Sequence, residues 1–287
     1  NKCTYCAIPY IRGPFVSRKM EDIIEEAKML AKKGIKELIV IAQDTTKYGV
    51  DIYGKSKLAE LLEELSKIED IKWIRFLYSY PEGITQELID LVATNNKITK
   101  YFDIPIQHIS NKILKTMNRK TSKQQIENLI KNIREKIPNV VLRTSLIVGF
   151  PGETKDDFIE LQDFIKKANF DRLGTFMYSK EDGTPAEKLP NQIHGNTKKS
   201  RYNKIMKIQN EISKQIMKKR IGTKCDVLIE DMSFDRKYYI GRTIQDAPDI
   251  DGIIYIKNIG NKNLLDQIIT CEIEDISGEY DLVGKII

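Results

Sequence analysis

Short apolar segments alternate with amphipathic segments along most of this sequence, and this alternation restricts the folds open to the chain. Segments rich in β-branched and aromatic residues lie at 36–42, 73–80, 101–106, 140–148 and 172–178. Apolar residues recur at helical spacing in the segments 14–34, 57–68, 85–95, 122–136 and 155–168. Strand–helix units of roughly 30 to 40 residues predict a parallel sheet with helices outside it.

The residues that open the chain add one more strand to this expectation. The segment 1–13 reads as a loop that leaves a strand, so a sixth strand is expected before it. Six parallel strands can form an open barrel or a doubly wound sheet. Periodicity does not separate these two folds.

The pattern changes after residue 179. A loop at 181–195 leads into a long helix at 197–220 that is dense in Lys and Arg. Short strand-like segments separated by turn residues follow at 225–230, 238–243, 252–256 and 267–276. We therefore expect an α/β domain over residues 1–222 and a small antiparallel β domain over residues 223–287.

Composition and charge narrow the class of protein. Hydrophobic residues make up 41% of the 287, and no apolar run approaches the ~20 residues that a membrane helix requires. Two of the four cysteines are isolated, so a disulfide scaffold is not expected and a reducing cytoplasm fits best. The net charge is +6, yet residues 223–287 contain 13 acidic and 7 basic residues. The C-terminal segment is thus acidic while the rest of the chain is basic, and this difference helps to decide whether the binding partner is a basic protein or a nucleic acid.

Cys3 and Cys6 form a C-x-x-C pair in the opening loop, with Tyr5 directly before the second cysteine. Such pairs occur in zinc half-sites, in iron–sulfur ligation and in redox-active loops. The pair alone leaves these three chemistries open. Cys225 and Cys271 are isolated and are expected to be buried thiols of the β domain.

Polar residues follow each of the five predicted strands, where parallel α/β folds collect their ligands. These strand ends are Gln43-Asp44-Thr45, Ser79-Tyr80-Pro81, Ile106-Gln107-His108, Gly149–Glu153 and Tyr178-Ser179. As a set they favour a shared ligand pocket facing the opening loop, although Thr154 and Asp157 form a capping-box pattern that needs no ligand. Gly149 permits either a close approach to a ligand or a tight turn. Arg143, inside an apolar strand, must reach a carboxylate ligand or pair with a nearby acid.

The opening loop resembles the cluster loop of the radical S-adenosylmethionine superfamily, whose pattern is C-x-x-x-C-x-φ-C, where φ is usually aromatic. Residues Cys3-Thr-Tyr-Cys6 match its last four positions. More narrowly, the chain resembles the methylthiotransferases of that superfamily. The supporting segments are Cys6–Gly13, Ala42–Gly49, Asp103–His108 and Arg143–Glu153, while Gly241–Gly252 resembles the TRAM domain, a small OB-like β-barrel. The resemblance implies an open six-stranded partial TIM-type barrel followed by that module.

The resemblance also implies cofactors and the residues that hold them. Cys3 and Cys6 would ligate a 4Fe-4S cluster, one of two in the full-length enzyme, and S-adenosylmethionine would bind its open iron. Tyr5 would lie beside the adenine. Further residues expected to line the S-adenosylmethionine pocket are Gln43, Asp44, Gln107, Arg143 and Gly149. No residue of this chain is assigned as an acid, base or nucleophile, because the radical generated from S-adenosylmethionine performs the hydrogen abstraction.

Among methylthiotransferases, the chain most resembles the type that modifies the β-carbon of an aspartate in a small-subunit ribosomal protein. The segments Gln43–Gly49 and Asp246–Gly252 carry this resemblance. The acidic β domain also suits docking to a basic ribosomal protein better than gripping tRNA phosphates. An electron donor is the other expected partner. Two alternatives stay open: modification of a tRNA adenosine, and a non-catalytic binding module with a zinc half-site.

The first cysteine of the pattern would lie two residues before Asn1. The resemblance therefore predicts that this chain is a fragment without the family's N-terminal domain. We expect such a fragment to be inactive alone.

Overall fold

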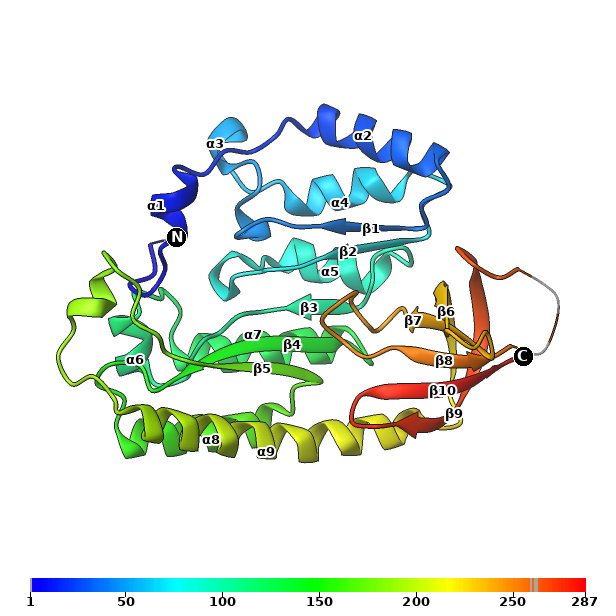
Figure 1. The fold of residues 1–287 in the computed structure, drawn as a ribbon. Helices are drawn as coiled ribbons and strands as arrows, with labels where there is room; N and C mark the ends of the chain where they lie inside the picture. The colour runs from blue at the N-terminus through cyan, green and yellow to red at the C-terminus, as the bar shows by residue number, and fades with distance from the viewer. Residues whose placement is uncertain (1, 259, 261–262) are drawn as a thin grey trace.

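The structure is a computed structural model that describes residues 2–258, 260 and 263–287. It consists of an α/β core and a closed β-barrel packed against one end of that core (Figure 1). The opening loop and α1 (Ile8–Arg12) lie at the end of the core opposite the barrel.

The core is built on five parallel strands in the described part of the chain. They are β1 (Glu37–Val40), β2 (Trp73–Phe76), β3 (Tyr101–Asp103), β4 (Val141–Val148) and β5 (Arg172–Met177). Strand β1 pairs with β2, and β3 and β5 flank β4. A parallel bridge between Ile74 and Ile98, and the hydrogen bond from Ser79 N to Asp103 O at 2.8 Å, connect the two groups of strands.

Spatial order therefore follows sequence order from β1 to β5. A doubly wound sheet would instead reverse its order at a switch point. The sequential order identifies the open-barrel alternative of the two that periodicity left open. The sixth strand was expected before residue 1, and the structure does not test it.

Helices cover the outer face of this sheet. The principal ones are α2 (Met20–Lys32), α4 (Leu58–Ser66), α5 (Gln86–Thr94), α7 (Lys123–Lys136) and α8 (Lys155–Ala168). Each begins within a few residues of its sequence prediction, except α2, which begins at Met20 rather than at residue 14. The predicted capping box of Thr154 and Asp157 is confirmed, and Ser122 with Gln125 forms a second one.

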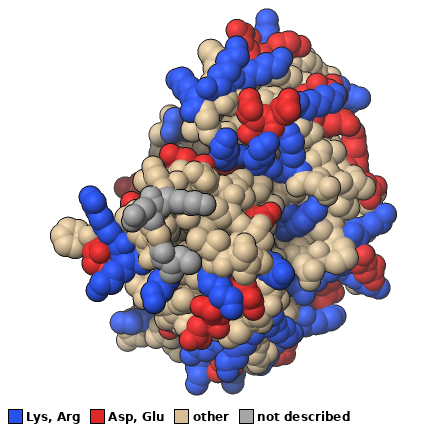
Figure 2. Space-filling view, turned by 90° about the vertical axis from the view of Figure 1, so that its right-hand side faces the viewer, with Lys and Arg blue, Asp and Glu red and all other residues tan. Residues whose placement is uncertain are grey.

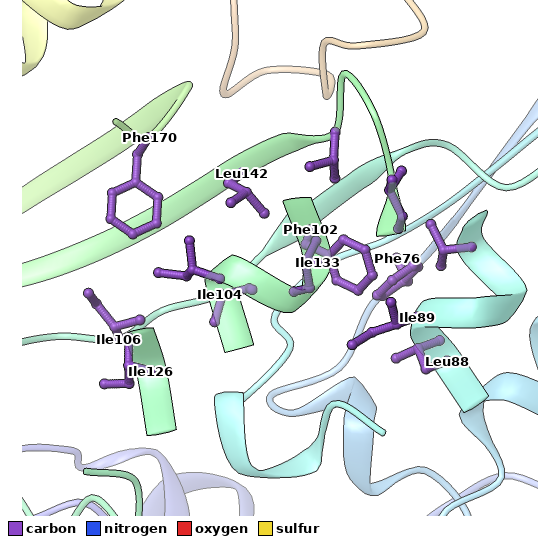
Figure 3. Packing of buried hydrophobic residues seen from close by; sticks show 14 of the residues in the cluster. Phe76, Leu88, Ile89, Phe102, Ile104, Ile106, Ile126, Ile133, Leu142 and Phe170 are labelled. Atoms are coloured by element: carbon purple, nitrogen blue, oxygen red, sulfur yellow. The ribbon is translucent and has the colours of Figure 1, made fainter. Parts of the chain in front are cut away.

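The core between sheet and helices is apolar and continuous. Phe76 and Phe102, on neighbouring strands, contact edge to face with ring centroids 5.4 Å apart. Figure 3 shows these rings among aliphatic side chains from α5, α7 and the strands. Every side chain labelled there is at most 2% exposed. Burial of this kind stabilises the fold by about 1.5–3 kcal/mol for each large apolar side chain.

Several short elements were not predicted. They are α1 (Ile8–Arg12), α3 (Val50–Tyr53), α6 (Asn111–Thr116) and the 3-10 helices η1 (Thr45–Lys47), η2 (Pro81–Gly83) and η3 (Pro185–Lys188). None is long enough for helical periodicity to show. Helix α9 (Gly195–Arg220) was predicted from residue 197, and it runs along the core to the barrel (Figure 1).

The C-terminal barrel contains β6 (Lys224–Met232), β7 (Tyr238–Thr243), β8 (Ile254–Lys257), β9 (Ile268–Ser277) and β10 (Asp281–Ile286). Its closed order is β10-β8-β7-β6-β9, and the described side chains inside it are mostly aliphatic. Strand β10 was not predicted. Gly284 interrupts its apolar pattern, and a Cβ there would make a tight contact, 3.0 Å from Glu272 O.

The loop after β7 fills the end of the core at which the core strands begin. Ala247 packs with Leu77, Tyr101 and Val141 inside the open barrel. Asp251 accepts a hydrogen bond from Tyr101 Oη at 2.7 Å, and Asp246 pairs with Arg172 at 2.6 Å. This segment, which carried the TRAM resemblance, closes the floor of the core rather than projecting into solvent.

A second ion-pair group extends the same contact. Glu37, at the start of β1, binds Arg75 at 2.8 Å and Arg242 at 2.7 Å. Arg75 is 0% exposed and also donates to the backbone oxygen of Ile244 at 3.0 Å. Breaking one partner of such a buried group destabilises a protein by about 3–5 kcal/mol. These contacts therefore bind the barrel to the core.

None of the helices in the described part of the chain has the length and apolar character needed to cross a membrane.

Candidate active site

The opening loop lies at the end of the core where the parallel strands finish (Figure 1). Thr4 fixes it from both sides. Its N–H donates to Met117 O at 3.1 Å, its hydroxyl donates to Thr116 O at 2.9 Å, and its carbonyl accepts from Ala186 N at 2.9 Å. The end of α6 and the short helix η3 thus position the two flanking cysteines.

Both cysteines of the loop are free thiols. Cys3 is 6% exposed and Cys6 is partly exposed, and the turn between them closes with a hydrogen bond from Cys6 N to Cys3 O at 3.2 Å. Within the described ranges, no group of three or more His, Cys, Asp or Glu side chains could hold a metal ion. The described residues therefore supply two thiol ligands of any metal group at this loop.

Arg119 and Tyr80 surround the Cys3 thiol. Arg119 Nη1 and Tyr80 Oη each lie 4.0 Å from Cys3 Sγ. The guanidinium stacks over the Tyr80 ring at 4.1 Å, and its Nη2 donates to Pro105 O at 2.8 Å. Burial raises the pKa of the Tyr80 phenol above its ordinary value, and the nearby Cys3 adds to this effect. The thiol thus faces a cation and a neutral hydroxyl group.

Tyr5 points from the loop into an aromatic cluster. Its ring contacts Phe150 edge to face with centroids 6.3 Å apart, and Phe150 contacts Tyr178 at 5.2 Å. The buried Tyr5 hydroxyl has no hydrogen-bond partner among the described residues. Burial raises the pKa of this phenol far above its ordinary value, with the neighbouring Cys3 as a further cause. Tyr5 therefore stays neutral at any physiological pH.

In the turn after β4, the side chain of a glutamate binds the backbone N–H groups of the same turn. Glu153, with a fully buried side chain, accepts hydrogen bonds from the backbone N–H groups of Gly149 and Phe150. It also pairs with Arg201 at 3.1 Å. Gly149 has φ of 71°, and a Cβ there would lie 2.4 Å from Lys198 Cγ. The tight-turn explanation therefore accounts for this glycine without a ligand.

His108 is completely buried beside this turn. Its Nδ1 accepts from Ser110 N at 3.0 Å, which places the proton of a neutral imidazole on Nε2. Nε2 lies 3.7 Å from Glu153 Oε1. His108 therefore belongs to the hydrogen-bonded packing of this turn.

The other predicted pocket residues lie at strand ends or inside the open barrel. Gln43 is exposed after β1, whereas Asp44 is 5% exposed and accepts from Thr46 Oγ1 at 2.6 Å. Gln107 is partly buried and continues β3, with its N–H bonded to Ser145 O at 2.9 Å. Arg143 pairs with Asp103 at 2.7 Å. Of the two alternatives for Arg143, pairing with a nearby acid is therefore present.

Two of these strand ends carry backbone strain. Tyr78 after β2 and Gln107 after β3 have φ of 59° and 68°, the left-handed region that non-glycine residues rarely adopt. Asp103 holds the first of them, accepting a hydrogen bond from Tyr78 N at 3.1 Å. Such strain gathers at functional sites, where the surrounding structure enforces it.

Sequence reasoning missed Arg119 and Asp103 as site residues. Arg119 follows the unpredicted helix α6, so no strand end pointed to it. Asp103 lies within a predicted strand, and the need of Arg143 for an acid partner was the signal that could have identified it. Tyr80 belonged to the predicted set of strand ends but was not singled out.

An apolar groove of about 460 Å³ lies away from this loop, between β1 and helices α2 and α4. Val16, Leu38 and Leu61 are among its lining residues, and it reaches Asp44 and Thr45 at the end of β1. The opening loop contributes no lining residue to it. The groove is therefore separate from the thiol pair.

Residues 1–165 match the radical SAM superfamily, and residues 221–287 match the TRAM domain. The chain belongs to the radical SAM superfamily.

Its curated relatives narrow the similarity. Over 286 residues the chain is 58% identical to the ribosomal protein uS12 methylthiotransferase RimO of Alkaliphilus oremlandii, covering all of this chain and 65% of that protein. It is 54% identical to the protein of the same name from Clostridioides difficile, of which it covers 64%. The chain thus spans somewhat less than two thirds of the length of these relatives. They confirm the predicted resemblance to this type of methylthiotransferase.

Solved structures share the fold of the core. The methyltransferase TsrM of Kitasatospora setae, with cobalamin and a [4Fe-4S] cluster bound, superposes with a TM-score of 0.53 at 18% identity, over 65% of this chain and 36% of that one. Coproporphyrinogen III oxidase HemN of Escherichia coli superposes with a TM-score of 0.51 at 17% identity, over 75% of this chain and 50% of that one. The expected α/β fold with a small C-terminal β-barrel is confirmed.

Proposed function

We propose that the protein containing this chain transfers a methylthio group to the β-carbon of an aspartate in ribosomal protein uS12 by radical S-adenosylmethionine chemistry. The observation that carries the proposal is 50–58% identity, over almost all of this chain, to proteins named for that activity. The geometry of the opening loop supports it independently.

The residues at the loop fit an iron–sulfur cluster. Two free thiols lie within one turn, and the buried guanidinium of Arg119 contacts one of them. Tyr5, Phe150 and Tyr178 form an apolar wall beside the loop. A thiolate-bound cluster is anionic, so a buried cation and an apolar surround suit it. Cys3 and Cys6 are the proposed ligands in this chain, of one of two clusters in the full-length enzyme.

We propose that S-adenosylmethionine binds along the strand ends between the loop and the interior of the open barrel. The proposed neighbours are Tyr5, Gln43, Asp44, Gln107, Arg143 and Gly149. When bound, the cluster and S-adenosylmethionine supply a 5′-deoxyadenosyl radical that removes hydrogen from the substrate carbon. In this arrangement Tyr5 supplies a neutral, apolar face, and the Arg143–Asp103 pair keeps both its charges compensated at 2.7 Å. The protein's part is to bind, orient and exclude water.

The division of the chain into a radical SAM core, residues 1–222, and a TRAM domain, residues 223–287, is part of the same proposal. It is supported by the end of α9 at Arg220 and the start of β6 at Lys224. Docking of basic uS12 on the acidic TRAM domain receives weaker support. The side chains of Asp246 and Asp251 are buried and pair with Arg172 of the core, so they do not contribute to an exposed acidic surface. Figure 2 shows acidic and basic side chains interspersed at the barrel end. The target protein and an electron donor are the proposed partners, in the cytoplasm.

The test uses the full-length protein, purified without oxygen and supplied with iron, sulfide, S-adenosylmethionine and dithionite. A peptide that carries the target aspartate of uS12 is the substrate. We expect 5′-deoxyadenosine to form and the peptide to gain the mass of one methylthio group less that of the hydrogen atom it replaces. The Cys3→Ala variant should lose both products, whereas Cys225→Ala should keep them.

Two outcomes would contradict the proposal. Methylthio groups found on tRNA adenosine but not on the peptide would assign the sister activity. Zinc without iron in the purified protein would assign the loop to a zinc half-site in a binding module.

A further inference from the structure

Arginines with little-exposed side chains follow a common pattern in this protein. Six of them form ion pairs with carboxylates and have side chains no more than 17% exposed: Arg75, Arg143, Arg172, Arg201, Arg220 and Arg242. This is the expected arrangement, because a buried charge is strongly destabilising unless an opposite charge compensates it.

Arg119 departs from this pattern. It is 7% exposed, and among the described residues no carboxylate oxygen lies within 4.0 Å of its guanidinium nitrogens. Its neighbours are the Cys3 sulfur at 4.0 Å, the Tyr80 ring at 4.1 Å and the carbonyl oxygen of Pro105 at 2.8 Å. Its Nε is buried without a hydrogen-bond partner. A ring face and one carbonyl group compensate a full positive charge only in part.

Among the described residues that contact Arg119, the Cys3 sulfur is the group that becomes anionic when it ligates a metal. We propose that Arg119 is the counter-ion of the cysteine-bound cluster at the opening loop and raises the reduction potential of that cluster. This inference deepens the proposed function and rests on its iron–sulfur site. Reduction by one electron makes the cluster more negative, so a fixed positive charge stabilises the reduced form more than the oxidised form.

Tyr80 positions the guanidinium for this task. The stacked ring fixes the plane of Arg119 and directs Nη1 at the sulfur, while Pro105 O anchors Nη2 on the other side. Because Arg119 is 7% exposed and Cys3 is 6% exposed, the charge is screened less than a surface charge would be. Arg119 and Tyr80 are positioning residues, since neither is proposed to contact the reacting carbon.

The experiment measures the reduction potential of the cluster in the anaerobic full-length protein by a dithionite titration followed by electron paramagnetic resonance. No uS12 peptide is present. The variants are Arg119→Gln, which removes the charge, and Arg119→Lys, which keeps it. Arg220→Gln is the control, because it removes a little-exposed arginine charge at the opposite end of the core.

We expect Arg119→Gln to lower the ratio of reduced to oxidised cluster at least tenfold at a fixed potential, a shift of about 59 mV for a one-electron couple. Arg119→Lys should stay within about threefold of the unmodified protein, and Arg220→Gln should match it. An unchanged potential in Arg119→Gln would overturn the proposal, and so would an equal shift in Arg119→Lys.

Loss of the cluster is also decisive. If Arg119→Gln loses its iron while Arg119→Lys retains it, the charge is needed to hold the cluster and the proposal stands. If both variants lose their iron, the cluster depends on the shape of the guanidinium group rather than on its charge, and the proposal fails. If Arg119→Gln shows the expected shift in potential but the separate activity assay leaves the uS12 peptide unmodified, only the proposed substrate is contradicted. Absence of iron from the unmodified protein would overturn both.

Discussion

Arg172, the first residue of the last core strand, binds Asp246 of the C-terminal barrel at 2.6 Å, with both side chains less than 10% exposed. Asp246 also lies 3.5 Å from Arg220 and accepts a hydrogen bond from Arg172. One carboxylate thus joins the core sheet, the end of α9 and the barrel. The barrel is therefore part of the floor of the core and not a separately tethered module.

Replacing Asp246 with Ala should destabilise the whole protein. The change leaves the two arginines without this partner in a buried setting, and removing one member of such a group lowers the free energy of unfolding by about 3–5 kcal/mol. Thermal unfolding followed by circular dichroism measures the loss. Glu279→Gln, at an exposed position of the same barrel, is the control and should change the free energy by no more than about 0.5 kcal/mol. An unaltered melting temperature in Asp246→Ala would show that the contact is not energetically coupled to folding.

Acid should weaken the same contact. Burial by itself would raise the pKa of Asp246, but Arg220 and Arg172 outweigh it and hold this pKa below its ordinary value. A carboxylate whose folded pKa lies below its unfolded value of about 3.9 stabilises the protein above that pH, and this contribution is lost as pH falls through the folded pKa.

Denaturant titrations between pH 7 and pH 3 test this sign. The free energy of unfolding should fall more steeply below about pH 4 in the unmodified protein than in Asp246→Asn. Asp251, whose pKa burial raises, acts in the opposite direction and is present in both proteins. Parallel pH curves for the two proteins would contradict the assignment to Asp246.

The sequence predicts the helices that are long enough to show a repeated apolar spacing. The helices over 122–136 and 155–168 were placed to within a residue, because their apolar spacing and their capping residues agree. It also placed Cys3 and Cys6 correctly in a loop at the strand ends. Arg119 and strand β10 were not predicted. Arg119 follows a helix of only six residues, and β10 contains a glycine that lies close to a neighbouring strand. Both depend on contacts between distant segments, which local patterns do not encode.

The floor of the core was hidden for the same reason. Asp246 and Asp251 looked like charges of an acidic surface, and in the sequence they counted toward a docking site. Their partners, Arg172 and Tyr101, are more than 70 residues away. A charge sum cannot distinguish a solvated carboxylate from one that is buried against an arginine.

Gly149→Ala should destabilise the turn after β4 through two separable effects. The residue has φ of 71°, where a side chain is strained, and its Cβ would lie 2.4 Å from Lys198 Cγ. Gly152→Ala is the matched variant, because Gly152 has φ of 80° but no atom within 4 Å of its Cβ. We expect a loss of about 1 kcal/mol in Gly152→Ala from strain alone, and a larger loss in Gly149→Ala. In a Lys198→Ala background, Gly149→Ala should cost less than in the unmodified protein, because the 2.4 Å contact with Cγ is removed. Equal losses in the two single variants would show that the clash is relieved without cost.

The barrel thiols should be chemically inert in the folded protein. Cys225 and Cys271 are directly opposite each other on β6 and β9, and both are free thiols. Burial raises the pKa of Cys225 to about 11 and that of Cys271 to about 12. Because the thiolate is the reactive form, alkylation by iodoacetamide at neutral pH should be very slow at both sites. Peptide mass spectrometry should find the two cysteines unmodified in the native protein and fully modified in guanidinium chloride. Rapid native labelling of Cys271 would show that the barrel opens at this edge.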